Sequence, residues 1–108
     1  LGMTNPHFTR IEDYRDIESL NMYQERIEKG LQPEDTLAIL AQKSRDNSRT
    51  PMQWNDSANA GFTTGTPWIA PCRNYPEINA EIALQDEDSV FYCYHNLIKL
   101  RKQQPILT

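Results

Sequence analysis

The chain has 108 residues, of which 38% are hydrophobic and 24% are charged, and its formal net charge is -4. That length allows one small domain, and no apolar run approaches the ~20 residues that a membrane-spanning helix needs, so no membrane partner is expected. Because 11 basic residues stand against 15 acidic ones, no basic excess is available to neutralise a phosphate backbone, and nucleic acid is not expected to bind. The sequence opens on Leu1 without an initiator Met or a leader, a start typical of a piece of a longer protein.

The cysteines and histidines carry no metal or disulfide signature. Cys72 and Cys93 are too few for a disulfide scaffold, and neither lies in a C-x-x-C pair. His7 and His95 are far apart and lack ligands at metal spacing, so a polar contact and a position on a helix face are favoured over a metal role. We predict neither a metal nor a cofactor. This cysteine usage favours a reduced cytoplasm.

The first half of the chain predicts two helices. The first runs over Ile17–Lys29, with Asp16 as its N-cap, Gly30 as a left-handed C-terminal residue and an apolar face of Ile17, Leu20, Tyr23 or Gln24, and Ile27. The second runs over Pro33–Lys43, because proline suits a first helical position. Acidic residues favour its positive N-terminal end, and its stripe consists of Leu37, Leu40 and Ala41.

A third helix is predicted over Ser89–Gln104, capped by Asp86 or Asp88 and stopped by Pro105. Apolar residues recur in it at helical spacing: Val90, Tyr94 and Leu97, with Phe91 and Ile98 beside them. Between residues 44 and 86 prolines and glycines interrupt every periodic pattern, and neither helix nor strand is predicted. Aromatic residues are scattered through this stretch of about forty residues, whereas disordered segments tend to lack them. We therefore predict an ordered loop that packs partly against residues outside this chain.

A polar motif at residues 44–54 is the most informative part of that loop. Arg45 and Arg49 offer fixed forks of N–H donors suited to carboxylates or vicinal hydroxyls, and Asp46 and Asn47 can shape a turn. Trp54 offers a flat face of the sort that lies against sugar rings. The alternative is an Arg–Asp pair that only stabilises the loop. Chemistry alone favours that alternative for the first arginine and leaves the second open.

The polar N-terminal segment, residues 5–16, is interpreted as a solvated loop that leads into a helix cap. Glu12 and Asp13 suggest acid–base chemistry, but adjacent side chains seldom face one pocket. A glycosidase needs its carboxylates on opposite sides of the bond that breaks. We assign this pair no catalytic role, and no nucleophile-elbow, phosphate-loop or zinc-protease motif occurs.

Several ordered segments together resemble the α-glucosidase branch of the α-amylase superfamily, glycoside hydrolase family 13. They cover essentially the whole chain: Gly2–Asn5, Ile11–Asp16, Ser44–Trp54, Ala60–Trp68, Asn74–Asn79, Asp88–Tyr92 and Leu97–Lys102. The resemblance implies a retaining glycosidase on a (β/α)8 barrel, with an Asp nucleophile, a Glu acid–base and a further Asp. Their motifs precede Gly2–Asn5 in family order, so no catalytic residue is expected in this chain, which alone should be inactive.

The resemblance implies a mainly α fold class: three helices and a long ordered loop, covering the barrel from after strand 8 through helix 8. Residues 1–108 would be the C-terminal portion of the catalytic domain. In this family an arginine at the position of Arg49 binds a hydroxyl of the non-reducing glucose, often held by an Asp of an early barrel loop that this chain lacks. Arg49 is therefore the predicted substrate-binding residue, and Arg45, Asp46 and Asn47 are its predicted frame.

Within the branch, residues 5–9 and 18–22 most resemble the enzymes that split trehalose 6-phosphate into glucose and glucose 6-phosphate, which implies a disaccharide phosphate as substrate. Oligo-1,6-glucosidases share the arginine motif and are the alternative. A non-catalytic helical binding module is the alternative of another class. Helices separated from a barrel leave faces such as Val90, Tyr94 and Leu97 uncovered, so marginal stability or self-association is expected.

Overall fold

The computed structural model describes residues 2–104 and 106 and is mainly helical, as predicted. Over these residues it contains four α-helices, three short 3-10 helices and no strand. The α-helices are α1 (Ile17–Glu28), α2 (Pro33–Lys43), α3 (Ala80–Gln85) and α4 (Val90–Gln103). The 3-10 helices are η1 (Ile11–Asp13), η2 (Arg45–Ser48) and η3 (Ala58–Gly61).

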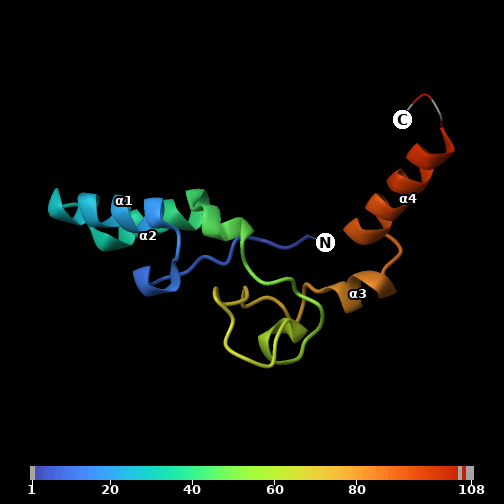
Figure 1. Ribbon diagram of the computed structural model, residues 1–108, viewed down its shortest axis with the longest axis horizontal. Helices are drawn as coiled ribbons and strands as arrows, with labels where there is room; N and C mark the ends of the chain where they lie inside the picture. The colour runs from blue at the N-terminus through green and yellow to red at the C-terminus, as the bar shows by residue number, and fades with distance from the viewer. Residues whose placement is uncertain (1, 105, 107–108) are drawn as a thin grey trace.

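Helices α1 and α2 form a hairpin whose ends follow local capping chemistry (Figure 1). Asp16 caps α1 by accepting a hydrogen bond from the backbone N–H of Ser19 at 3.1 Å, as predicted. The helix ends one residue earlier than predicted, and Gly30 follows with φ of +80°. Pro33 begins α2 as predicted. Leu40 and Ala41 are buried, whereas Ile17, predicted on the apolar face of α1, is 64% exposed.

Helix α4 confirms the third predicted helix but corrects its cap. Ser89 is the N-cap, and its hydroxyl accepts from the N–H of Tyr92 at 3.5 Å. Neither predicted aspartate caps the helix, because the Asp86 carboxylate accepts instead from the N–H of Asp88, at 3.0 Å in the preceding turn. The helix ends before Pro105, the predicted stop, which lies outside the described residues.

The prediction of three helices is wrong because α3 lies inside the segment interpreted as irregular. Asn79 caps it by accepting from the N–H of Ile82 at 2.9 Å. Its first N–H groups, those of residues 80 and 81, donate to the carbonyls of Gln53 and Trp54 at 2.9 and 3.0 Å. A helix of six residues is too short to show a 3.6-residue period, and distant backbone carbonyls complete its first turn.

The segment between α2 and α3 is ordered, as predicted. Gln53, Ala60, Ile69 and Cys72 are buried within it. The N–H of Trp54 donates to the carbonyl of Ala60 at 2.8 Å, which closes a loop over η3. Three consecutive residues of that turn, Asn59, Ala60 and Gly61, have left-handed φ values of 54° to 68°. The loop therefore holds its shape by backbone hydrogen bonds and a few buried side chains.

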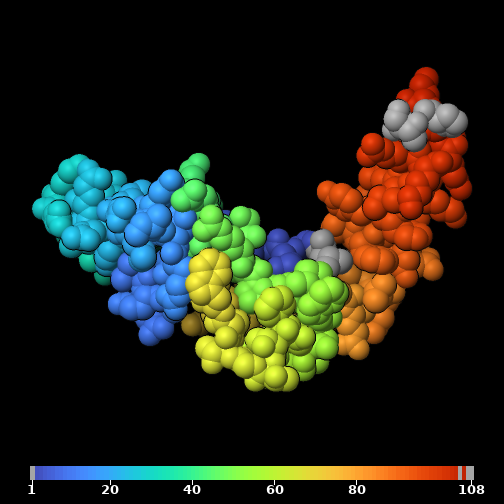
Figure 2. Space-filling model, viewed as in Figure 1, coloured from blue at the N-terminus to red at the C-terminus, as the bar shows by residue number. Residues whose placement is uncertain are grey.

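The molecule is an open crescent (Figure 2), with the α1–α2 hairpin at one end and α4 at the other. Its radius of gyration is 17.8 Å, against about 13 Å for a compact chain of this length. Helix α4 packs against α3, but Val90, Tyr94 and Leu97 are 43%, 64% and 56% exposed. Among the described residues that face is therefore largely uncovered, as predicted.

Candidate functional site

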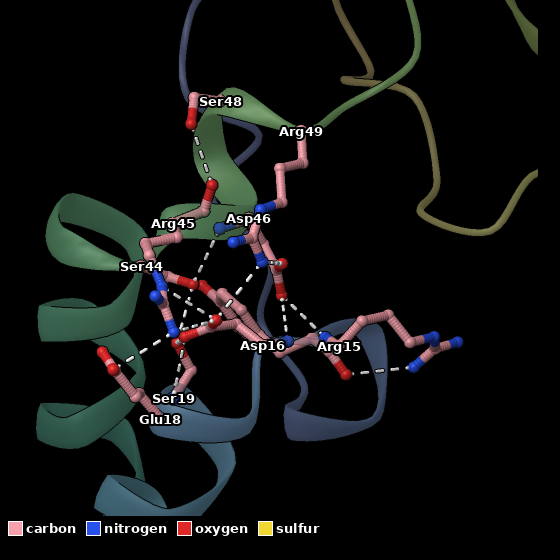
Figure 3. A network of polar contacts seen from close by, with 10 residues as sticks. Arg15, Asp16, Glu18, Ser19, Ser44, Arg45, Asp46, Ser48 and Arg49 are labelled. Carbon is pink, nitrogen blue, oxygen red and sulfur yellow. Dashed lines mark hydrogen bonds and ion pairs between the residues drawn. The ribbon is translucent and has the colours of Figure 1, made fainter.

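Two segments far apart in the chain converge at the base of the α1–α2 hairpin (Figure 3). One is the start of α1, residues 15–19, and the other is the turn around η2, residues 44–49. At the centre lie two aspartates, Asp16 and Asp46, which are 5% and 0% exposed. Arg45 and Arg49 donate to these carboxylates from the η2 side.

Asp46 is the structural centre of the site. Its Oδ2 atom accepts from the backbone N–H groups of Arg15 at 2.6 Å and Asp16 at 2.8 Å. Its Oδ1 atom accepts from Nη1 of Arg49 at 3.4 Å. A buried carboxylate needs such partners because its burial without them is very costly. Asp46 thereby ties the η2 turn to the chain that enters α1.

Asp16 links the α1 cap to both arginines. Its Oδ2 atom accepts from the N–H and the hydroxyl of Ser19, both at 3.1 Å. Its Oδ1 atom accepts from Nε of Arg45 at 3.0 Å and from Nη1 of Arg49 at 3.2 Å. Burial raises the pKa of the Asp16 carboxyl, but the hydrogen bonds from Arg45 and Ser19 outweigh it and hold the pKa below its ordinary value. Asp16 is therefore an anion at neutral pH.

Two serine hydroxyls connect the Asp16 side of the network to the Asp46 side. The hydroxyls of Ser19 and Ser44 lie 2.8 Å apart, and the Ser44 hydroxyl also accepts from the N–H of Asp46 at 3.2 Å. Asn47 donates to the carbonyls of Leu40 at 3.1 Å and Ala41 at 3.2 Å, which satisfies the end of α2. Of the predicted frame residues, Asp46 therefore contacts Arg49 directly, whereas Asn47 contacts the end of α2.

Arg49 is the half-exposed member of the network, with 39% of its side chain accessible. Only its Nη1 contacts the two aspartates; among residues 2–104 and 106 nothing accepts from Nε or Nη2. The guanidinium is therefore anchored at one nitrogen while its other donors stay available for a hydroxyl. Arg45 pairs with Asp16 at 2.8 Å and with the exposed Glu18 at 3.3 Å, the Arg–Asp pairing expected for a stabilised loop.

The other candidates lie outside this network. Trp54 is half-exposed and lines a shallow groove with residues of α3 and α4, Leu84 and Phe91 among them. Asp13 pairs on the surface with Arg10 at 2.9 Å. Sequence reasoning missed the pairing of Asp16 with the arginines, because 29 and 33 positions separate them and no local spacing marks it.

The described part of the chain shows no group of three or more His, Cys, Asp or Glu residues that could hold a metal ion. None of its helices is long and apolar enough to cross a membrane.

Comparisons with known proteins relate the chain to glycoside hydrolases. The chain is 64% identical over 108 residues to trehalose-6-phosphate hydrolase of Escherichia coli K12, covering 100% of this chain and 20% of that protein. It is 58% identical over 108 residues to an oligo-1,6-glucosidase of Parageobacillus thermoglucosidasius, covering 99% and 19%. The crystal structure of Bacillus licheniformis trehalose-6-phosphate hydrolase superposes with a TM-score of 0.94 at 59% identity, covering 100% and 20%.

The chain therefore spans about a fifth of the length of the relatives it matches. Residues 1–108 also match the family described as alpha amylase, catalytic domain. The family expected from the ordered motifs is thereby confirmed: the chain belongs to the alpha-amylase catalytic-domain family.

Proposed function

We propose that this chain is part of a retaining α-glycosidase that hydrolyses trehalose 6-phosphate to glucose and glucose 6-phosphate in the cytoplasm. The observation that carries the proposal is the 64% identity over the whole chain to a trehalose-6-phosphate hydrolase. In this proposal residues 1–108 are the C-terminal portion of the (β/α)8 catalytic domain, covering the segment after strand 8 through helix 8, which is α4. The catalytic carboxylates then belong to the rest of the protein.

Arg49 is the proposed substrate-binding residue of this portion. Two buried aspartates hold its Nη1, and Nε and Nη2, from which no described residue accepts, supply donors for a glucose hydroxyl. Hydrogen bonds from a charged donor contribute roughly 1.5–3 kcal/mol. Removing this donor should therefore lower kcat/KM by about 10- to 100-fold.

The test is Arg49→Ala in the full-length protein, with hydrolysis of trehalose 6-phosphate as the assay. Arg10→Ala is the matched control, because Arg10 also pairs with an aspartate but lies on the surface outside the network. We expect a large loss for the first variant and an unchanged kcat/KM for the second. A near-normal kcat/KM for Arg49→Ala would remove Arg49 from the site.

A second candidate function is hydrolysis of α-1,6-linked oligosaccharides, favoured by the 58% identity to an oligo-1,6-glucosidase. Measuring kcat/KM of the full-length protein on trehalose 6-phosphate and on isomaltose decides between the two. A non-catalytic binding module would turn over neither substrate. The 108-residue chain alone should be inactive, and turnover by it would contradict the assignment of the carboxylates to the rest of the protein.

A further inference from the structure

We infer that Asp16 is a positioning residue that fixes the Arg49 guanidinium in its binding orientation and so couples the α1–α2 hairpin to the substrate site. The inference rests on the proposed role of Arg49 as the residue that binds the sugar. It adds a residue 33 positions upstream, at the entrance to a helix hairpin that otherwise extends away from the η2 turn (Figure 1).

The geometry assigns Asp16 more than a capping role. Its two oxygens face different groups: Oδ2 satisfies the start of α1 at Ser19, and Oδ1 faces the guanidinium groups of Arg45 and Arg49. A serine, threonine or asparagine would cap α1 about as well. An asparagine has one acceptor oxygen, so it can serve the helix or the arginines, but its amide N–H₂ would then face donors on the other side. An aspartate therefore serves both the helix cap and the two arginines, whereas capping alone would not require a second acceptor oxygen.

Asp16 is also the nearer of the two anchors of Arg49. The distance from Nη1 is 3.2 Å to Asp16 and 3.4 Å to Asp46. Asp46 already accepts two backbone N–H groups, and it stands three residues before Arg49 on the same turn. Asp16 comes from another element, so it fixes where the guanidinium lies relative to the hairpin.

An arginine side chain loses much of its rotamer freedom when it is fixed, which is an entropic cost. Because the buried Asp16 carboxylate, which is 5% exposed, already pairs with Arg49 in the folded protein, the arginine loses this freedom on folding and not on substrate binding. Without that anchor Arg49 keeps one carboxylate partner and can leave the binding orientation. Misplacement of a binding group by about 1 Å can lower activity by up to ~100-fold.

The test is a double-mutant cycle in the full-length protein with Asp16→Asn, Arg49→Ala and the double variant, assayed by kcat/KM. Asp16→Asn alone should lower kcat/KM about tenfold, and it should have no further effect in the Arg49→Ala background. The matched control is Glu18→Gln, which also converts a carboxylate to an amide but contacts only Arg45. That control should leave kcat/KM unchanged.

Two results overturn the inference: full activity of Asp16→Asn, or the same tenfold loss repeated in the Arg49→Ala background, which would show that Asp16 acts through the fold. If Arg49→Ala itself retains full activity, the proposed role of Arg49 fails, and the inference fails with it. If Asp16→Asn does not fold, Asp16→Glu goes through the same cycle. That variant keeps the charge but moves it by one methylene, and the absence of an effect in the Arg49→Ala background remains the criterion.

Discussion

Removing the Asp46 carboxylate should open the junction between the η2 turn and α1. Asp46→Ala leaves the N–H groups of Arg15 and Asp16 without their acceptor, at a position that is 0% exposed. The N–H of Asp16 is buried and that of Arg15 partly buried, and an unsatisfied buried donor costs roughly 1–3 kcal/mol, so local opening should become easier by about 2 kcal/mol. That corresponds to about 30-fold faster exchange of the two amide hydrogens, since 1.4 kcal/mol is about tenfold.

Hydrogen exchange read by mass spectrometry on a peptide that spans residues 11–20 measures this opening in the full-length protein. Asp46→Asn is the matched control, because one amide oxygen can still accept both N–H groups, as Oδ2 does now, and only the contact of Oδ1 with the half-exposed Arg49 is lost. Its loss should stay below about 1 kcal/mol, or fivefold in rate. Unchanged exchange in Asp46→Ala, or equal acceleration in both variants, would refute the assignment of Asp46 as the acceptor that holds the junction.

Two further predictions concern the loop and the exposed helix face. Gly61→Ala should destabilise the η3 turn by roughly 1–3 kcal/mol, because φ is +68° and an added Cβ would lie 2.5 Å from Oδ1 of Asn55. Gly65→Ala, with its nearest neighbour at 3.7 Å, should leave stability almost unchanged, and equal thermal unfolding midpoints for the two variants would contradict this. The isolated 108-residue chain should self-associate through α4, where Tyr94 and Leu97 are more than half exposed. Light scattering should show mass rising with concentration, and a monomer at every concentration would contradict the expectation.

Helix ends were predictable wherever one residue decides them locally. Asp16, Gly30 and Pro33 act within three residues of the ends they set, so single-sequence chemistry identifies them. The cap of α4 was misassigned because acidic residues and Ser89 are adjacent candidates. A turn formed by the Asp86 carboxylate, which no periodicity reveals, decides between them.

Helix α3 shows the limit of periodic patterns. Six residues make less than two turns, and its first N–H groups donate to carbonyls of Gln53 and Trp54, which lie 27 residues earlier. A short helix of this kind forms because distant backbone supplies its missing acceptors, and propensity is only a weak guide to it.

The candidate site was likewise predictable only in part. The resemblance to the family predicts the binding role of Arg49 and its frame of Arg45, Asp46 and Asn47, and the structure places those frame residues in η2. The pairing of Arg49 with Asp16 depends on the α1–α2 hairpin returning the chain to the start of α1. Neither segment alone shows that Arg49 and Asp16 meet. Residues 15–19 do carry one excess negative charge and residues 44–49 one excess positive charge, which a partner could neutralise.

The same hairpin explains why a chain with so little core still holds a defined polar site. The radius of gyration and the uncovered α4 face show that much apolar surface lacks a partner within the described residues. The Asp16–Asp46–Arg49 network needs no such partner, because the described residues 15–19 and 44–49 supply the acceptors and donors that anchor it. The orientation of Arg49 seen here is therefore set by contacts within these residues, whereas the proposed function assigns the catalytic carboxylates to the rest of the protein. Structural measurements on Arg49 and Asp16 thus separate binding geometry from catalysis.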